Sequence, residues 1–426
     1  MSEPRARRGG LIPFAIWTLI CLLSVGTFAK DIVPGSVAGL GLNQIVLLGL
    51  LPIMSLLSLY SGAGRLLVGP LPMLLLVGAG WAALSAVWSQ NPIGSLVKGL
   101  TLVMVVLSVA WVVVRLNAKQ VVQGILLGAV IALVISLVAV ILLPNLAGTT
   151  DFHPGAWRGI YGQKNVLGRG ALIATAISMV LAMTEKSVGK RLGYALVGAF
   201  ALFMLLRSTS ATALLAVGLF FVGYPFFLAL SRAPTAIRLL ATIALFIGLV
   251  LLVPAATTAV GAAAGELGRD ASLTGRVPLW IFALGEIAKR PLLGYGFDAY
   301  FLGTPESDAY LLAHLRWVPE MAHNGLIDLL LELGIVGAVI VFSSVIALLA
   351  RVSKASLNPY TRSLVIATFL LMLFMNITES NFFRPSNLLW IMFIVAALRV
   401  HYEGVVRMSN AARQPRPRPV RMEQRA

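Results

Sequence analysis

Charged residues and cysteine are both scarce in this chain. Only 12% of its 426 residues are Asp, Glu, Lys or Arg, whereas about a quarter of a soluble globular domain is charged. The single cysteine, Cys21, cannot form an internal disulfide and excludes a cysteine-based metal cluster. With a hydrophobic fraction of 59% and a mean hydropathy of +0.92, the composition indicates an integral membrane protein.

Acidic residues are scarce relative to basic ones. The chain has 33 Lys and Arg against 16 Asp and Glu, which gives a formal net charge of +17. In a soluble protein this excess would suggest nucleic-acid binding. In a membrane protein it has a simpler cause, because cytoplasmic loops accumulate Lys and Arg, so we expect no nucleic-acid partner.

What the chain has in abundance is apolar runs of about 20 residues, the length that crosses a bilayer. Twelve such runs occupy roughly residues 11–29, 40–60, 66–87, 96–115, 121–143, 166–184, 192–206, 211–230, 236–254, 324–350, 362–378 and 386–400. We interpret the first as a retained helix and not a signal peptide, because no small-residue cleavage site follows it. The sequence therefore predicts an all-α polytopic integral membrane protein with about twelve transmembrane helices.

The distribution of basic residues predicts the orientation of these helices. If the basic N-terminus (1–10) is cytoplasmic, the loops rich in Lys and Arg all fall on the cytoplasmic side. The chain then divides into transmembrane helices 1–9 (11–254), one large periplasmic loop (255–323), helices 10–12 (324–400) and a basic cytoplasmic tail (401–426). We expect the tail to be disordered and close to anionic membrane lipid.

The loops predicted to lie outside the cytoplasm nevertheless carry cations, against the orientation rule. An anionic ligand at the outer membrane boundary explains them most economically, and phosphate is the leading candidate because Arg binds it through two hydrogen bonds. The alternative is that these side chains reach lipid headgroups or pair with carboxylates such as Glu286 and Glu379.

Three of these cations lie in short outer connections. Arg158 and Lys164 belong to a glycine-containing link, residues 157–165, directly before a predicted helix whose free N–H groups favour an anion. Arg207 lies at the tight turn between the seventh and eighth spans, where Ser208 or Ser210 could cap the next helix. A plain interfacial turn is the alternative for residues 157–165.

Within the large loop, Arg276 directly precedes a predicted surface helix. Trp280, Ala283, Leu284 and Ile287 recur at helical spacing, with Glu286 off this stripe, so the helix should lie along the membrane surface as a short interfacial element. The Arg276 guanidinium could then add to a phosphate site near the N-terminus of that helix.

The strongest signal for chemistry is His323, at the outer end of the tenth span. An imidazole titrates near physiological pH and can accept a proton from a hydroxyl; the alternative is a satisfied interfacial histidine. Asp328 and Glu332 lie deeper in the same span, where acidic residues are functional or paired. We assign Glu332 to helix packing.

His323 and Asn324, nine intervening residues and then Gly334-Ile335-Val336-Gly337 resemble the signature of bacterial O-antigen ligases. The preceding Gly275-Arg276 and Pro291-Leu292-Leu293-Gly294-Tyr295-Gly296 are similar to the wider superfamily of ligases, O-antigen polymerases and O-linked oligosaccharyltransferases. The resemblance covers about residues 155 to 345.

The resemblance implies a bacterial inner-membrane glycosyltransferase with its active site on the periplasmic face. Such a ligase transfers a glycan from undecaprenyl pyrophosphate to a sugar hydroxyl of lipid A-core, without a cofactor or an obligatory metal. It implies His323 as the general base, and Arg276 with Arg207 or Arg158 as pyrophosphate ligands. Lys164 and Asn324 join them as candidate contacts to the pyrophosphate or glycan.

Three other functions remain open. A polymerase would extend the carrier-linked glycan, and an oligosaccharyltransferase would glycosylate protein, although no extra domain favours that. A transporter for the lipid-linked glycan would place ionisable residues near the bilayer midplane, whereas here the outer cations gather on one face.

Overall fold

The computed structural model describes residues 10–29, 31–33, 41–148, 155–231, 276–301, 304–315, 317–354 and 357–413, with isolated positions between 233 and 244. These residues fold as helices, without a β-strand, and one isolated β-bridge joins Phe28 and Tyr161. The helices are α1 (Leu11–Leu23), α2 (Leu42–Tyr60), α3 (Pro70–Leu84), α4 (Pro92–Arg115), α5 (Ala118–Leu142), α6 (Lys164–Thr184), α7 (Val188–Ser208), α8 (Ala211–Leu230), α10 (Arg276–Lys289), α11 (Pro305–Leu315), α12 (Gly325–Lys354), α13 (Pro359–Thr378) and α14 (Leu388–Arg413), with short helical turns at Ala63–Leu67, Ser85–Val87 and Pro144–Gly148.

Ten of the described helices are long and apolar enough to cross a membrane, namely α2 to α8 and α12 to α14. The first predicted span is shorter than expected, because α1 ends at Leu23. Beyond it, the side chain of Asn43 donates to the carbonyls of Leu23 and Gly26, so this segment satisfies its backbone outside a helix. The predicted span 236–254 lies almost entirely outside the described residues, and residues 255–275 of the large loop lie outside them as well.

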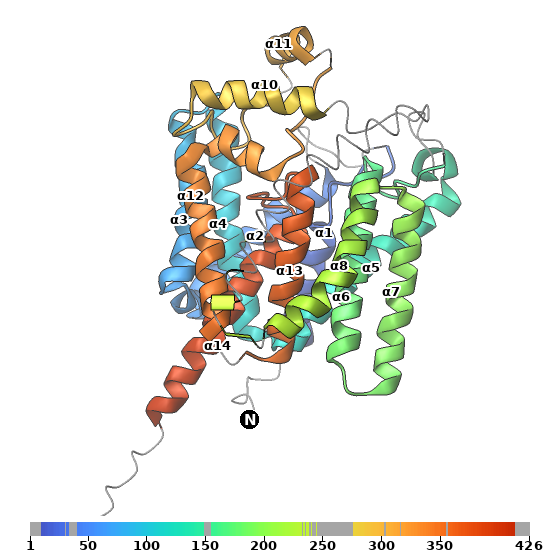
Figure 1. The fold of residues 1–426 in the computed structure, drawn as a ribbon, viewed down its shortest axis with the longest axis vertical. Helices are drawn as coiled ribbons and strands as arrows, with labels where there is room; N and C mark the ends of the chain where they lie inside the picture. The colour runs from blue at the N-terminus through green and yellow to red at the C-terminus, as the bar shows by residue number, and fades with distance from the viewer. Residues whose placement is uncertain are drawn as a thin grey trace, which may run out of the picture.

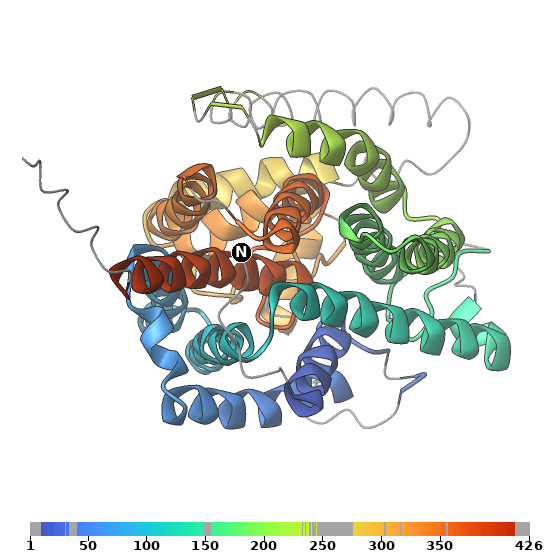
Figure 2. The ribbon, with the colours of Figure 1, turned by 90° about the horizontal axis from the view of Figure 1, so that it is seen from below.

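The helices pack as a bundle with α10 and α11 across one end (Figure 1). We call this end the site end. Viewed from below, α14 lies among the other helices (Figure 2), and it packs against α3, α4, α12 and α13. Residues 388–398 of α14 are all buried. It also extends past the predicted boundary at residue 400, as far as Arg413, while residues 414–426 lie outside the described part.

Helix α12 was predicted as one span, but it is broken at Gly334. This glycine has φ +65° and ψ −168°, a conformation that only glycine adopts without strain. The carbonyls of Leu331 and Glu332 accept hydrogen bonds from Tyr295 N–H and Gly296 N–H, each 2.9 Å long. Segment 291–296 therefore fills the break and replaces the helical partners of these carbonyls.

The other side of the break is satisfied in the same way. Ile335 N–H donates to the Pro291 carbonyl at 2.8 Å, and Val336 N–H donates to the Leu292 carbonyl at 3.3 Å. The glycines and proline that stand out in segments 291–296 and 334–337 thus have a structural explanation. They allow a loop to pair with the interior of an apolar helix without leaving buried backbone groups unpaired.

Candidate active site

Connections that are far apart in the sequence meet at the site end of the bundle. Trp157 N–H donates to the Arg207 carbonyl at 2.9 Å, which joins the α5–α6 connection to the end of α7. The Arg276 guanidinium, on the first described residue of α10, donates to the Thr378 carbonyl at the end of α13 at 2.8 Å. The loops that carry the outer cations predicted from the sequence therefore adjoin one another.

Glu379, the residue that follows α13, is the centre of this region. Its carboxylate Oε2 lies 3.6 Å from His323 Nδ1, and Oε1 lies 3.6 Å from Arg276 Nη2. Asn165 on α6 donates its side-chain N–H to Oε1 at 3.3 Å. Glu379 is only 8% exposed, so residues from three different parts of the chain share one buried carboxylate.

The charge of Glu379 is stabilised by its neighbours. Burial on its own would raise the pKa of Glu379, but His323, Arg276 and Arg169 outweigh burial and hold the pKa below its ordinary value. Arg169 is anchored beside this group by donating to the Val25 carbonyl at 3.3 Å. Glu379 is therefore an anion at neutral pH.

His323 is held by its backbone and remains partly open to solvent at its side chain. Its φ of +51° is unusual for a residue with a side chain, and its side chain is 20% exposed. Trp280 of α10 donates its indole N–H to the adjacent Ala322 carbonyl at 2.9 Å. Because Nδ1 faces Glu379 and has no hydrogen-bond partner among the described residues, it is the nitrogen suited to carry the proton, which leaves Nε2 as the acceptor.

Asp328 ties the His323 loop to the Glu379 loop. This buried side chain of α12 accepts a hydrogen bond from Ala322 N–H at 2.9 Å and another from the Ser380 hydroxyl. Ala322 precedes His323 and Ser380 follows Glu379. The spacing between the imidazole and the carboxylate thus depends on one carboxylate in the helix below them.

A second charged cluster surrounds Arg384, in the connection between α13 and α14. Its guanidinium donates to Asp298 at 2.7 Å and to Glu332 at 2.8 Å, and Lys98 of α4 pairs with the same Asp298. Glu332, which was assigned to helix packing, joins α12 to this connection through an ion pair. The sequence signal for this pair was the general expectation that an acidic residue in a span has a partner.

The structure places Arg276 in contact with a carboxylate, the alternative that the sequence left open. Its guanidinium lies at the C-terminal end of α13, and its side chain is 11% exposed. Asn324 caps α12, since its side-chain oxygen accepts from the backbone N–H groups of Leu326 and Ile327. Its amide donates to the Ile377 carbonyl at 3.1 Å, so Asn324 joins the start of α12 to the end of α13.

Arg158 and Arg207 lie in neighbouring loops, and among the described residues neither contacts His323 or Glu379. Arg158 pairs with Asp31 and donates to the Leu146 carbonyl at 2.6 Å. Arg207 is exposed, with its guanidinium carbon 4.5 Å from the centre of the Trp157 ring. Arg207 therefore has room to turn toward a ligand, whereas Arg158 is already paired.

Lys164 is the first residue of α6, directly before the Asn165 that binds Glu379. The predicted serine cap after Arg207 is wrong. Ser210 occupies the N-cap position of α8 but makes no side-chain cap, and the Ser208 hydroxyl donates back to the Leu205 carbonyl. Gly159 has φ +59° and lies against Ser136 of α5, so it serves helix contact.

The helix predicted to lie at the membrane surface corresponds to α10, and its buried side differs partly from the predicted stripe. Ala283 is buried as expected and Leu279 lies beside it, but Leu284 is 53% exposed. Glu286, predicted to lie off the stripe, is buried and accepts hydrogen bonds from Lys289, Tyr295 and Tyr310. These polar partners allow a carboxylate to occupy the covered side of the helix.

Sequence reasoning gave Glu379 no role beyond that of a possible ion-pair partner, and it overlooked Asn165 and Arg169. A usable signal existed for Arg169, because an ionisable residue inside a predicted span is a functional candidate by default. Asn165 and Arg169 are four residues apart, which places them on one face of α6. Glu379 could be linked to them only through the fold.

The comparisons with known proteins identify part of this chain. No curated protein matches it, but the family model described as O-antigen ligase matches residues 194–342. The matched segment runs from α7 into α12 and includes Arg207, Arg276, His323 and Asn324, while Glu379 lies beyond it. Over these residues the chain is similar to the O-antigen ligase family.

Proposed function

We propose that this protein transfers O-antigen glycan from undecaprenyl pyrophosphate to a sugar hydroxyl of lipid A-core, on the periplasmic face of the bacterial inner membrane. The match of residues 194–342 to the O-antigen ligase family supports a glycosyltransferase that acts on lipid-linked glycans. The observation that carries the proposal is the placement of His323 beside the buried Glu379, with Arg276 and Arg169 at the same carboxylate.

In the proposed reaction His323 is the general base. Nε2 accepts the proton of the acceptor hydroxyl as its oxygen forms a bond to the anomeric carbon of the donor glycan. The bond from that carbon to the pyrophosphate oxygen breaks, and its electron pair leaves with the pyrophosphate. The imidazolium that forms on His323 is stabilised by the negative charge of Glu379 at 3.6 Å. Catalytic hydrogen bonds are often long before substrate binds, so this contact is expected to shorten in the complex.

The departing pyrophosphate needs positive charge, which arginines supply. We assign Arg276 to it first, because Nη2 lies 3.6 Å from Glu379, too far for a hydrogen bond, and can turn to a phosphate oxygen. The exposed Arg207 is the second candidate, and Lys164 at the start of α6 is the third. Arg158 would need to exchange its pairing with Asp31, and Asn324 would contribute by fixing the start of α12.

The test is transfer by purified protein from undecaprenyl-pyrophosphate-linked glycan to lipid A-core, with a chelator present and without ATP. We expect product from the wild type and loss of at least about a hundredfold in rate from His323→Ala. His314→Ala is the matched control, because His314 is an exposed histidine on α11 that bonds to the Tyr310 carbonyl. Near-normal transfer by His323→Ala would remove His323 as the base.

The same assay distinguishes a ligase from a polymerase by the acceptor that receives the glycan. Lengthening of the carrier-linked glycan without lipid A-core would identify a polymerase. Movement of labelled lipid-linked glycan across liposomes, without a new glycosidic bond, would favour a transporter.

A further inference from the structure

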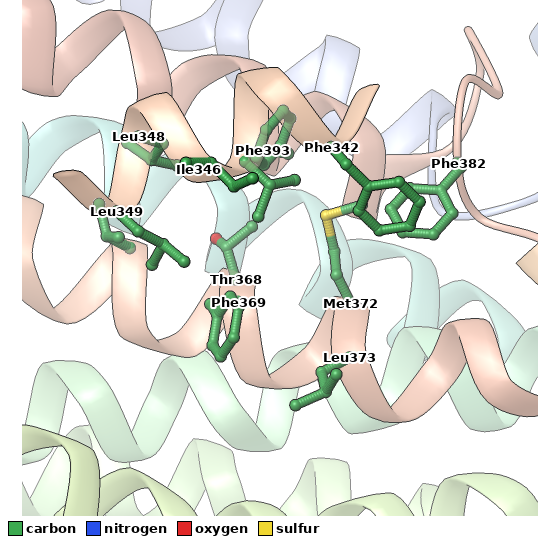
Figure 3. A pocket seen from close by; sticks show the side chains of 12 residues that line it. Phe342, Ile346, Leu348, Leu349, Thr368, Phe369, Met372, Leu373, Phe382 and Phe393 are labelled. Atoms are coloured by element: carbon green, nitrogen blue, oxygen red, sulfur yellow. The ribbon is translucent and has the colours of Figure 1, made fainter. Parts of the chain in front are cut away.

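An apolar groove lies between α12 and α13, below the site end (Figure 3). Its volume is about 330 Å³, and eleven of its twelve lining side chains are apolar, Thr368 being the exception. Ile346 in the lining is 60% exposed, so the groove is open to the outside of the bundle. We call it the α12–α13 groove. Its lining excludes a charged or strongly polar occupant.

The groove runs along the direction in which these helices cross the membrane. On α13 its lining extends from Val365 to Leu373, eight residues or about 12 Å along the helix axis. Leu373 lies near the end of α13 that leads into Glu379, and Val365 lies nearer the opposite end. An elongated hydrocarbon chain fits this shape and chemistry.

One end of the groove reaches the loop that carries the candidate site. Phe382, which lines the groove, lies three residues after Glu379 in the connection between α13 and α14. Phe342, on the part of α12 that follows the break at Gly334, lies against Phe382 with ring centres 6.1 Å apart. The end of the groove at Phe382 is therefore only three residues along the chain from Glu379.

We propose that the α12–α13 groove binds the first isoprene units of the donor's polyprenyl chain. This inference rests on the proposed function, in which the pyrophosphate binds beside Glu379. In the donor the hydrocarbon chain starts directly at the phosphate, so its first units must lie within reach of that site. In the acceptor the core sugars separate the acyl chains from the reacting hydroxyl. The acyl chains can therefore lie away from the pyrophosphate site.

The groove also gives a reason for the position of the pyrophosphate. A polyprenyl chain held between α12 and α13 fixes the lateral position of its phosphates against Arg276, and binding energy from the chain helps to orient the reacting bond. The affinity for donor should then depend on prenyl chain length up to the length of the groove.

Filling the groove tests this inference. Ile346→Trp and Leu373→Trp add bulk to its two walls, and Leu56→Trp on α2 is the control, because Leu56 is 67% exposed and lies outside the groove. In the wild type, KM for the donor should fall as the prenyl chain is lengthened. In the filled variants KM for the long-chain donor should rise roughly tenfold, with kcat unchanged, and should no longer depend on chain length. Equal chain-length dependence in wild type and filled variants would overturn the proposal.

A binding measurement separates this inference from the proposed function. A photoactivatable undecaprenyl pyrophosphate, in nanodiscs of phosphatidylglycerol, should label peptides of α12 and α13, and the label should fall in Ile346→Trp. Unlabelled undecaprenyl pyrophosphate should compete, whereas extra phosphatidylglycerol should not. Labelling with this pattern but without glycan transfer would contradict the proposed function alone. Transfer without labelling of α12 or α13, or competition by phosphatidylglycerol, would contradict the groove as the prenyl site.

Discussion

At the scale of single residues, the site depends on Glu379, a single carboxylate that is surrounded by more than one basic side chain. Two arginines and a histidine share this one carboxylate, so the group retains positive charge for an anionic substrate even before the exposed Arg207 is considered. Glu379 both orients His323 and limits how strongly Arg276 attracts phosphate. Its removal should therefore affect chemistry and donor binding in opposite directions.

We expect Glu379→Gln to lower kcat by roughly tenfold to a thousandfold. The amide keeps the size of the side chain but cannot stabilise the imidazolium. KM for the donor should stay the same or fall, because Arg276 and Arg169 lose their counter-charge. Steady-state kinetics with the donor varied would measure both effects.

Glu320→Gln is the control for this variant, since Glu320 is an exposed carboxylate close to His323 in the chain. Glu379→Asp should recover part of kcat. Parallel loss of kcat and of folded protein, without recovery by Asp, would assign Glu379 to stability alone.

At the scale of elements, the break in α12 sets the direction of the segment that carries Asp328. The carbonyls and N–H groups freed at Gly334 are taken by residues 291–296, so the break is a satisfied structure. It also requires glycine, because a Cβ at position 334 would collide with the Leu292 carbonyl.

Gly334→Ala should therefore destabilise the protein by at least about 2 kcal/mol, from backbone strain and from displacement of segment 291–296. Thermal unfolding in detergent should show a lower Tm together with reduced transfer. Gly285→Ala is the matched control, because Gly285 is helical and has open space around its Cβ position, where Ala should be neutral or slightly stabilising. Equal Tm values for the two variants would mean that the break can relax at little cost.

The contact between α10 and α11 should depend on pH through Glu286. Burial on its own would raise the pKa of Glu286, but hydrogen bonds from Lys289, Tyr310 and Tyr295 outweigh burial and keep the pKa below its ordinary value. A carboxyl with a lowered folded-state pKa contributes stability above its unfolded pKa, about 4.3 for Glu, and loses it as the pH falls through the folded value. We expect hydrogen exchange in residues 304–315 to be slow at neutral pH and to rise on acidification below about pH 4.

Glu286→Gln should give fast exchange in α11 already at neutral pH, with little further change on acidification. Glu306→Gln, at an exposed position of α11, should behave like the wild type. The same acid response in Glu286→Gln and wild type would show that other groups hold α11.

At the scale of the whole molecule, the sequence predicted the repetitive parts of the fold better than the contacts between them. Long apolar runs fix most helix positions within a few residues, because span length is set by the membrane. The early end of α1 and the break in α12 depend on Asn43 and on residues 291–296, which are partners in space with no local signal. For the same reason the sequence could name Glu379 as a possible ion-pair partner, but it could not show that Glu379 joins His323 to Arg276.

Residues 291–297, which fill the break in α12, also form hydrogen bonds to residues outside the segment that the family model matches. Phe297 N–H donates to the Ser85 hydroxyl, and Gln90 N–H donates to the Tyr295 carbonyl. Residues between α3 and α4 thus stabilise the segment that fills the break in α12. We therefore expect that residues 194–342 do not fold as an independent unit. Expressed alone they should misfold, whereas two co-expressed fragments divided between α8 and α10 keep this bracing only if they reassemble in one membrane.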